Sequence, residues 1–242
     1  MSPRFIGRRD AGRQLASELI ARHWADPVVL ALPRGGVPVA AEVAAALNAP
    51  LDLLFVQKIG APQQRELAVA ALAEGPPETL VLDDETLALT GATRSYVERE
   101  AAIARAEMAR RRACYLGTRT PVPVTGRTAI VVDDGIATGT SMRAALRAVR
   151  ARRPARLVLA VPLAPARVVA ELTPEVDDLV CLETPQPFHA VGAHYALFAQ
   201  VSDDEVIAAM APGPATASNN DKPPEPRCRN HPPRCPPSVD TS

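Results

Sequence analysis

Residues 128–141 read TAIVVDDGIATGTS, an apolar run followed by two acids and then by small and hydroxyl residues. The β-branched run at 129–132 is typical of a strand buried on both faces in a parallel sheet. Two adjacent carboxylates, Asp133 and Asp134, follow at its carboxyl end, which is the edge where open α/β sheets bind ligands. A helical pattern begins a few residues later. The stretch therefore predicts a strand, a ligand-binding loop and a helix in direct succession.

The loop after the carboxylates carries the residue types that a phosphate site needs. Small residues let the backbone approach a ligand closely, and hydroxyl groups and free N–H groups at a helix start favour an anion. The carboxylates suit the neighbouring hydroxyls of a sugar, so we expect one site for a sugar diol and a phosphate. Its expected residues are Asp133, Asp134, Gly135, Ala137, Thr138, Gly139, Thr140 and Ser141.

This stretch resembles the phosphoribosyl pyrophosphate (PRPP) fingerprint of type I phosphoribosyltransferases. In that family the two acids hold the ribose 2- and 3-hydroxyls and the loop holds the 5-phosphate, which implies these roles for Asp133, Asp134 and residues 135–141. Another pair, Asp83-Asp84, also follows a short apolar run but lacks the loop of glycine and threonine. We interpret Asp84 as a helix N-cap.

A second loop, Pro33-Arg34-Gly35-Gly36, follows an expected strand at 28–32 and opens a helix. Its two glycines expose consecutive N–H groups as an anion-binding nest, and Arg34 adds a permanent positive charge. The loop resembles the pyrophosphate-binding loop of the same family, which implies pyrophosphate contacts for Arg34, Gly35 and Gly36. The alternative is a plain turn between a strand and a helix.

The segment 57–66, QKIGAPQQRE, follows the next expected strand, and we expect a loop at 60–65. With the preceding loop it resembles a subgroup of uncharacterised bacterial predicted phosphoribosyltransferases. In type I enzymes a mobile loop in this region closes over PRPP, which implies that Lys58 reaches the pyrophosphate and that Arg65 arrives on closure. The alternative is a solvated loop with ordinary surface charges.

Aromatic residues gather in one place, FHAVGAHYALF at 188–198. In the family a hood segment, here at about residues 183–200, supplies the acceptor pocket. The resemblance implies that Phe188, His189 and Tyr195 shape this pocket. The alternative is that the aromatic rings pack the hood onto the sheet.

Composition narrows the class of protein. The chain has 242 residues, 47% of them apolar, and 27 basic residues balance 27 acidic ones. A net charge of zero gives no electrostatic reason to expect nucleic acid or an anionic membrane as a partner. No apolar run is long enough for a transmembrane helix, and the N-terminal residues lack the apolar core of a secretory signal. We therefore expect a cytoplasmic protein.

Strand and helix patterns alternate along residues 1–211. We therefore expect an α/β fold with a mostly parallel twisted sheet flanked by helices, in one phosphoribosyltransferase domain with a small hood. The expected strands are 28–32, 51–56, 67–73, 79–82, 129–132, 157–161 and 179–182. The expected helices are 10–24, 37–47, 95–115, 141–152, 166–172 and 203–210.

Residues 212–242 differ in character, because they are rich in proline and polar residues and have almost no large apolar side chains. We predict a disordered tail there. Cys228, His231 and Cys235 have metal-like spacing within it. Three ligands are fewer than the four of a structural zinc site, so we expect no protein-held metal.

The family resemblance implies a reaction in which a small-molecule acceptor, not identified by the sequence, displaces pyrophosphate from PRPP. It implies Mg²⁺ as the cofactor, held mainly through PRPP and water, and it leaves a homodimer open. The implied catalytic residues are Lys58, Arg65, Asp133 and Asp134. Two alternatives stay open: a PRPP- or nucleotide-sensing regulatory protein without catalysis, and a phosphosugar hydrolase or other nucleotide-binding protein on the same sheet.

Overall fold

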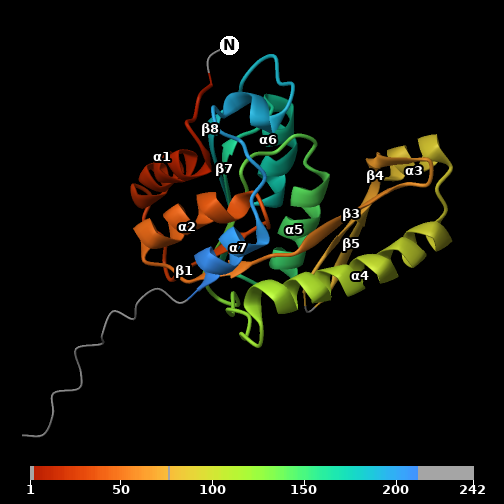
Figure 1. Cartoon of the computed structure of the whole chain (residues 1–242), viewed down its shortest axis with the longest axis horizontal. Helices are drawn as coiled ribbons and strands as arrows, with labels where there is room; N and C mark the ends of the chain where they lie inside the picture. The colour runs from red at the N-terminus through yellow and green to blue at the C-terminus, as the bar shows by residue number, and fades with distance from the viewer. Residues whose placement is uncertain (1–2, 76, 212–242) are drawn as a thin grey trace, which may run out of the picture. The chain divides into compact units, whose positions relative to one another are not determined.

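A five-stranded parallel sheet forms the centre of the protein, in a computed structural model that describes residues 3–75 and 77–211 (Figure 1). The strand order is β2-β1-β6-β7-β8, and every neighbouring pair is parallel. These strands are β1 (Pro27–Ala31), β2 (Leu51–Leu53), β6 (Thr128–Val132), β7 (Arg156–Leu163) and β8 (Asp178–Glu183). The parallel sheet with flanking helices confirms the predicted fold class.

Helices cover both faces of this sheet. On one face lie α1 (Arg8–Ile20), α2 (Gly36–Leu47) and α7 (Asp203–Met210), and on the other lie α5 (Thr140–Ala151) and α6 (Ala166–Leu172). Alternate strand residues therefore enter different cores. Ile130 packs in the core with α1 and α2, whereas its neighbour Val131 packs in the core with α5 and α6. Burial on both faces explains why β6 reads as a continuous apolar run.

A smaller antiparallel sheet lies beside the first and has the order β3-β4-β5. Its strands are β3 (Val56–Ala61), β4 (Gln64–Ala73) and β5 (Thr79–Leu82). The long helix α4 (Arg94–Leu116) packs on one face through Val97 and Ala101, and α5 packs on the other through Ala144 and Ala148. The short helix α3 (Asp84–Thr90) follows β5 of this sheet. A 3-10 turn at Val191–His194 lies in the hood.

The structure corrects three predictions in this region. The expected strand 51–56 is split, because β2 ends at Leu53 and β3 begins at Val56 in the other sheet. The expected loop 60–65 is a β-hairpin with only residues 62–63 between its strands. Gly60 indicates a bulge rather than a loop: the pairing register shifts there, and a Cβ on Gly60 would clash with the backbone of Arg65. The helix α3 is capped by Asp83, not Asp84.

The other expected strands and helices are present, with ends that differ by a few residues. Among the described residues, no helix combines the length and the apolar character needed to cross a membrane. The predicted tail at 212–242, with Cys228, His231 and Cys235, lies outside the described residues.

Candidate active site

The carboxyl ends of β1 and β6 meet at the candidate site. Pairing of Ala31 with Val132 brings the loop after β1 beside the loop after β6. A cavity of about 200 Å³ opens at this edge. Its lining includes Pro33, Lys58, Asp133, Gly135, Ala137, Thr138, Gly139 and Ser141. The structure therefore brings most of the predicted fingerprint residues to one cavity.

The two glycines of the first loop lie directly against the strand end that carries the carboxylates. A Cβ on Gly35 would clash with the carboxylate of Asp134, and a Cβ on Gly36 would lie 2.8 Å from the carbonyl oxygen of Val132. Gly35 has φ −57°, so space and not backbone conformation requires glycine there. The close packing places the backbone of this loop against the aspartate pair.

The fingerprint loop ends in a glycine for a different reason. Gly139 has φ +84°, a left-handed conformation that favours glycine, and it is the N-cap of α5. Thr138, Thr140 and Ser141 surround this turn, with Thr138 exposed and Thr140 half-buried. The first N–H groups of α5 have no intrahelical partner, so this turn offers an anion-binding helix start.

Electrostatics at the aspartate pair oppose ionisation. Burial and the neighbouring charge of Asp134 raise the pKa of Asp133 well above its ordinary value, while Arg8 and Lys58 act in the opposite direction. Burial also raises the pKa of Asp134, against the hydrogen bond and charge of Arg8. Arg8 and Lys58 therefore compensate the two adjacent carboxylates only in part.

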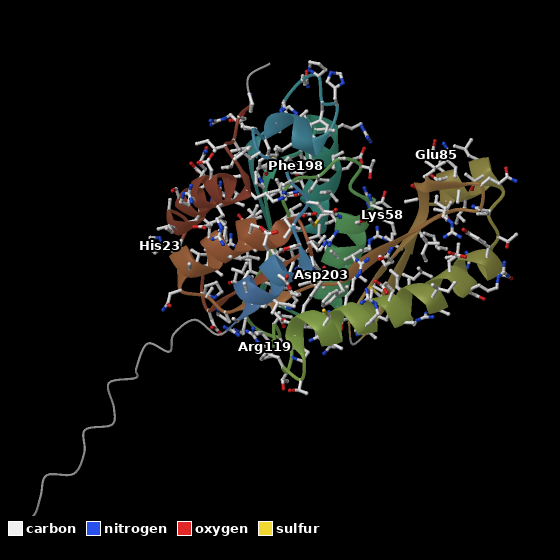
Figure 2. The ribbon with its side chains drawn as sticks, in the orientation of Figure 1. His23, Lys58, Glu85, Arg119, Phe198 and Asp203 are labelled. Atoms are coloured by element: carbon white, nitrogen blue, oxygen red, sulfur yellow. The ribbon has the colours of Figure 1, made fainter. Side chains whose placement is uncertain are left out.

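Lys58 reaches this cavity from the antiparallel sheet (Figure 2). It lies within β3, pairs with Ala71 of β4, and does not stand at the end of a parallel strand as the sequence suggested. Arg65 belongs to the next strand of the hairpin. Its side chain is 77% exposed and pairs with Glu100 of α4 at 3.4 Å, so the structure does not bring Arg65 to the cavity.

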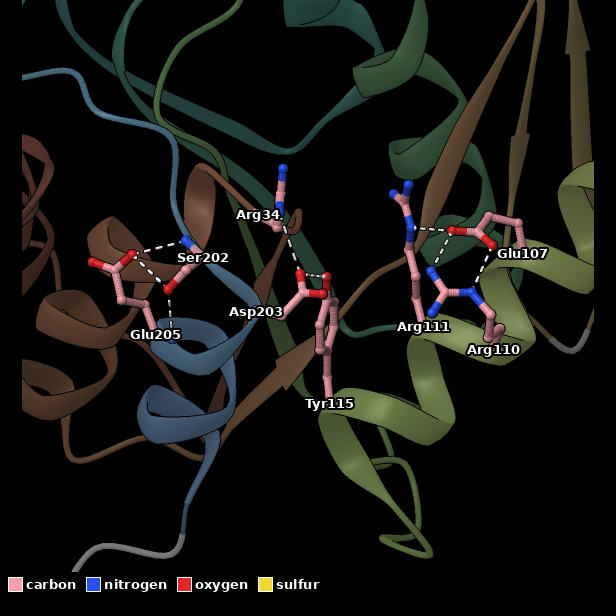
Figure 3. Close-up of polar contacts among 8 residues, drawn as sticks. All are labelled: Arg34, Glu107, Arg110, Arg111, Tyr115, Ser202, Asp203 and Glu205. Atoms are coloured by element: carbon pink, nitrogen blue, oxygen red, sulfur yellow. Dashed lines mark hydrogen bonds and ion pairs between the residues drawn. The ribbon is translucent and has the colours of Figure 1, made fainter.

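Arg34 stands at the candidate pyrophosphate loop, but its guanidinium contacts a carboxylate of the protein. Its Nη1 lies 3.3 Å from Asp203 Oδ1, at the start of α7 (Figure 3). The same Oδ1 accepts a hydrogen bond from the Tyr115 hydroxyl at 2.6 Å. Burial, followed by this hydrogen bond, raises the pKa of Tyr115 to about 12, so the phenol stays a donor at neutral pH.

The three predicted acceptor-pocket residues have different environments. His189 is exposed, and Phe188 is half-buried against the hood with its ring centroid 5.5 Å from that of His194. Tyr195 is only 5% exposed, and its hydroxyl donates to the backbone carbonyl of Asp134. Its ring packs on Phe198 at 5.0 Å, which leaves little of the ring free to stack on a ligand.

Arg8 is a site residue that the sequence did not reveal. Its Nε donates to Asp134 Oδ2 at 2.7 Å. In the sequence Arg8 is one of several charges before an amphipathic helix, and 126 residues separate the two partners. No local pattern indicates a contact over that separation.

Comparisons with known proteins find a family model, sequence relatives and a solved structure that are similar to this chain. The family model for the phosphoribosyl transferase domain matches residues 7–195. Two Mycobacterium tuberculosis proteins, from strains CDC 1551 and H37Rv and each named as a candidate phosphoribosyl transferase, are 47% identical over 207 residues. The match covers 84% of this chain and 46% of each relative, so the chain spans about half the length of these curated relatives. The crystal structure of TT1426 from Thermus thermophilus is 43% identical, with a TM-score of 0.73 over 86% of this chain and 97% of that chain.

Proposed function

This chain belongs to the phosphoribosyl transferase family, and on that premise we propose that it binds PRPP and transfers its phosphoribosyl group to a small-molecule acceptor. Pyrophosphate is the leaving group. One observation carries the proposal: the aspartate pair, the glycine loop at 35–36 and the start of α5 meet at one sheet edge. That arrangement supports neighbouring contacts to a sugar diol, a leaving pyrophosphate and a phosphate.

Each group has a role in the proposed reaction. Asp133 and Asp134 accept hydrogen bonds from the ribose hydroxyls and favour the positive charge that develops on the ring as the C1–O bond breaks. Residues 135–141 hold the 5-phosphate with backbone N–H groups and hydroxyls. The backbone at Gly35 and the ammonium of Lys58 stabilise the departing pyrophosphate, whereas the N–H of Gly36 already donates to the carbonyl oxygen of Leu32. Catalysis then comes from positioning and electrostatics, without a covalent enzyme intermediate.

Mg²⁺ fits this site as a cofactor held by the substrate. Among the described residues, no group of three or more His, Cys, Asp or Glu side chains is arranged to hold a metal ion. Mg²⁺ commonly keeps several waters and binds through substrate phosphates with few protein ligands. When bound it would neutralise charge on the pyrophosphate, and Asp133 and Asp134 would remain free to hold the ribose.

Arg34 and Arg65 would each have to leave a present ion-pair partner before they could bind pyrophosphate. Arg34 would leave Asp203 to contact pyrophosphate, and Arg65 would leave Glu100. Both present pairs are partly exposed, so breaking them costs little.

Phe188 and His189 remain the side chains proposed to face an acceptor, while Tyr195 supports the loop that carries Asp134. We further propose that residues 1–211 are the phosphoribosyltransferase domain and that the protein acts in the cytoplasm.

Two successive measurements test the function. Calorimetry with PRPP and Mg²⁺ should show saturable binding at micromolar concentrations. A screen of nucleobases and other small acceptors should then show pyrophosphate release. Binding without turnover of any acceptor would instead favour a PRPP-sensing regulatory protein. Absence of PRPP binding would contradict the proposal.

A further inference from the structure

Arg8 is held in place by three groups at once. Besides Asp134, it donates from Nη1 to the carbonyl oxygen of Ala199 at 2.7 Å. Its guanidinium carbon lies 3.8 Å from the centroid of the Phe198 ring, which is a cation–π contact. The side chains of Arg8 and Asp134 are 11% and 13% exposed, so solvent and salt screen their attraction weakly.

The backbone around Arg8 fixes this arrangement. The N–H groups of Arg4 and Phe5 both donate to the carbonyl oxygen of His194. In return, Ala196 and Leu197 donate to the carbonyl oxygens of Phe5 and Ile6. This short ladder joins the segment that precedes α1 to the hood. The residues that hold the Arg8 side chain are thereby attached to the backbone that carries it.

The segment before α1 and the hood, joined in this way, make two contacts with Asp134. Arg8 binds the carboxylate, and the hydroxyl of Tyr195 donates to the backbone carbonyl of the same residue. Within the described residues, Oδ2 of Asp134 accepts the Arg8 hydrogen bond and Oδ1 accepts none. Arg8 therefore holds one carboxylate oxygen of Asp134, and the other has no side-chain partner among the described residues.

We propose that Arg8 is a positioning residue for the reaction, which holds Asp134 through Oδ2 so that Oδ1 is presented to a ribose hydroxyl. The inference rests on the proposed function, because it assigns Asp134 to the sugar. Arg8 also compensates part of the negative charge that the two adjacent carboxylates carry when they are ionised. Residues 194–199 of the hood are in this way coupled to the carboxylate of Asp134.

The test compares Arg8→Gln with a matched control, Arg9→Gln. Arg9 is adjacent, but its side chain is 68% exposed and pairs with Glu42 at 3.0 Å, away from the aspartates. We expect Arg8→Gln to weaken PRPP binding about 10- to 100-fold in calorimetry, by analogy with partners that orient ligating side chains. Arg9→Gln should bind as the wild type does.

A pH series separates positioning from general structural damage. The charged groups around Asp134 are Arg8 and Asp133, with Tyr195 beside its backbone and Lys58 near Asp133. Arg8 lowers the pKa of Asp134, so its removal should raise that pKa. In Arg8→Gln, the loss of PRPP affinity on acidification should then begin at a higher pH than in the wild type. Arg8→Lys, which keeps the charge, should restore part of the affinity and shift the onset back.

Several results would overturn the inference. Unchanged PRPP affinity in Arg8→Gln would show that Asp134 needs no such partner, and tighter binding would show that Arg8 competes with the sugar. Weaker binding without a shift in pH dependence would assign Arg8 a structural role only.

If Arg8→Gln does not fold, Phe198→Leu keeps the arginine and removes its ring contact. That variant should bind PRPP about 3- to 10-fold more weakly, and unchanged binding would contradict the proposal. Absence of PRPP binding in the wild type would contradict the proposed function itself.

Discussion

Two aspartate pairs in this protein have the same sequence and different surroundings. Asp133-Asp134 follows β6, which lies between β1 and β7 in the parallel sheet. Asp83-Asp84 follows β5, which pairs with β4 at the edge of the antiparallel sheet. Asp83 caps the helix that starts at the next residue, with Oδ1 2.9 Å from the backbone nitrogen of Thr86. Asp134 is held by Arg8, which is 126 residues away.

The comparison shows that the partner of a carboxylate can be local or distant: Asp133 Oδ1 accepts from the backbone N–H of Asp134, whereas Asp134 is held by Arg8. Asp83 finds a donor three residues along the chain, so it stabilises local structure. The loop after Asp134 delays the helix to Thr140, which leaves the carboxylates at the sheet edge where open α/β folds commonly bind ligands. Lys58 lies between the two pairs, since it lines the cavity with Asp133 and also the groove of about 710 Å³ with Asp83 and Asp84.

The largest expected difference between the pairs is in PRPP binding. Asp133→Asn with Asp134→Asn should weaken binding at least about 100-fold, because two charge-assisted hydrogen bonds of about 1.5–3 kcal/mol each are weakened. The matched variant Asp83→Asn with Asp84→Asn should bind normally. Calorimetry with PRPP and Mg²⁺ measures both. Equal effects of the two double variants would remove the distinction between the pairs.

Lys58 should act with the first pair and not with the second. Lys58→Ala should lower kcat about 10²- to 10³-fold and affect PRPP affinity less, because charge on pyrophosphate grows as the C1–O bond breaks. The effect of Lys58→Ala should be the same with and without Asp83→Asn. Steady-state kinetics with an acceptor from the screen provides the test. A loss of affinity with full kcat would make Lys58 a ground-state binding residue only.

Removing the charge of Asp133 should raise the thermal stability of the protein at pH 7, whereas removing the Asp83 side chain should lower the free energy of unfolding. The pKa of Asp133 is raised in the folded protein, so between its ordinary value and the raised value the folded state binds more protons than the unfolded state. Stability contributed by the protonated side chain is therefore lost as the pH rises through this window. Asp133→Asn should raise Tm at pH 7, by about 2–4 °C for each kcal/mol gained, and have less effect near pH 4. Thermal unfolding at both pH values checks this, and a lower Tm at pH 7 would contradict it.

The smallest expected effect is at the helix cap. Asp83→Ala should cost about 1 kcal/mol of unfolding free energy, because the N–H of Thr86 loses its acceptor. Asp84→Ala is the control, since Asp84 lies within the first turn of α3 and makes no cap bond there. Urea unfolding should separate the two variants while PRPP binding stays unchanged in both. A larger cost for Asp84→Ala would reassign the cap.

Whether a feature could be predicted from the sequence depended on whether local residue preferences or distant contacts determine it. The strand at 128–132 and its loop were predictable because each residue's local preference agrees with its place in the sheet. The hairpin at β3 and β4 was not, because Gly60 and Pro62 are typical of loops and here accompany a bulge and a turn. The partners of Arg8 and Arg34 were not predictable either, since 126 and 169 residues separate each arginine from its aspartate.

The ladder between residues 4–6 and 194–197 has a consequence for how the protein folds. Contacts this distant in sequence close a very large loop, and such contacts slow folding because the chain loses entropy before they form. During synthesis, the segment before α1 leaves the ribosome long before the segment that pairs with it. The parallel strands β1 and β6 can associate earlier, so we expect the central sheet to form first. The hydrogen bonds of Arg8 and Tyr195 to Asp134 should form last. Ligand-binding competence would then appear only when residues up to about 199 have emerged.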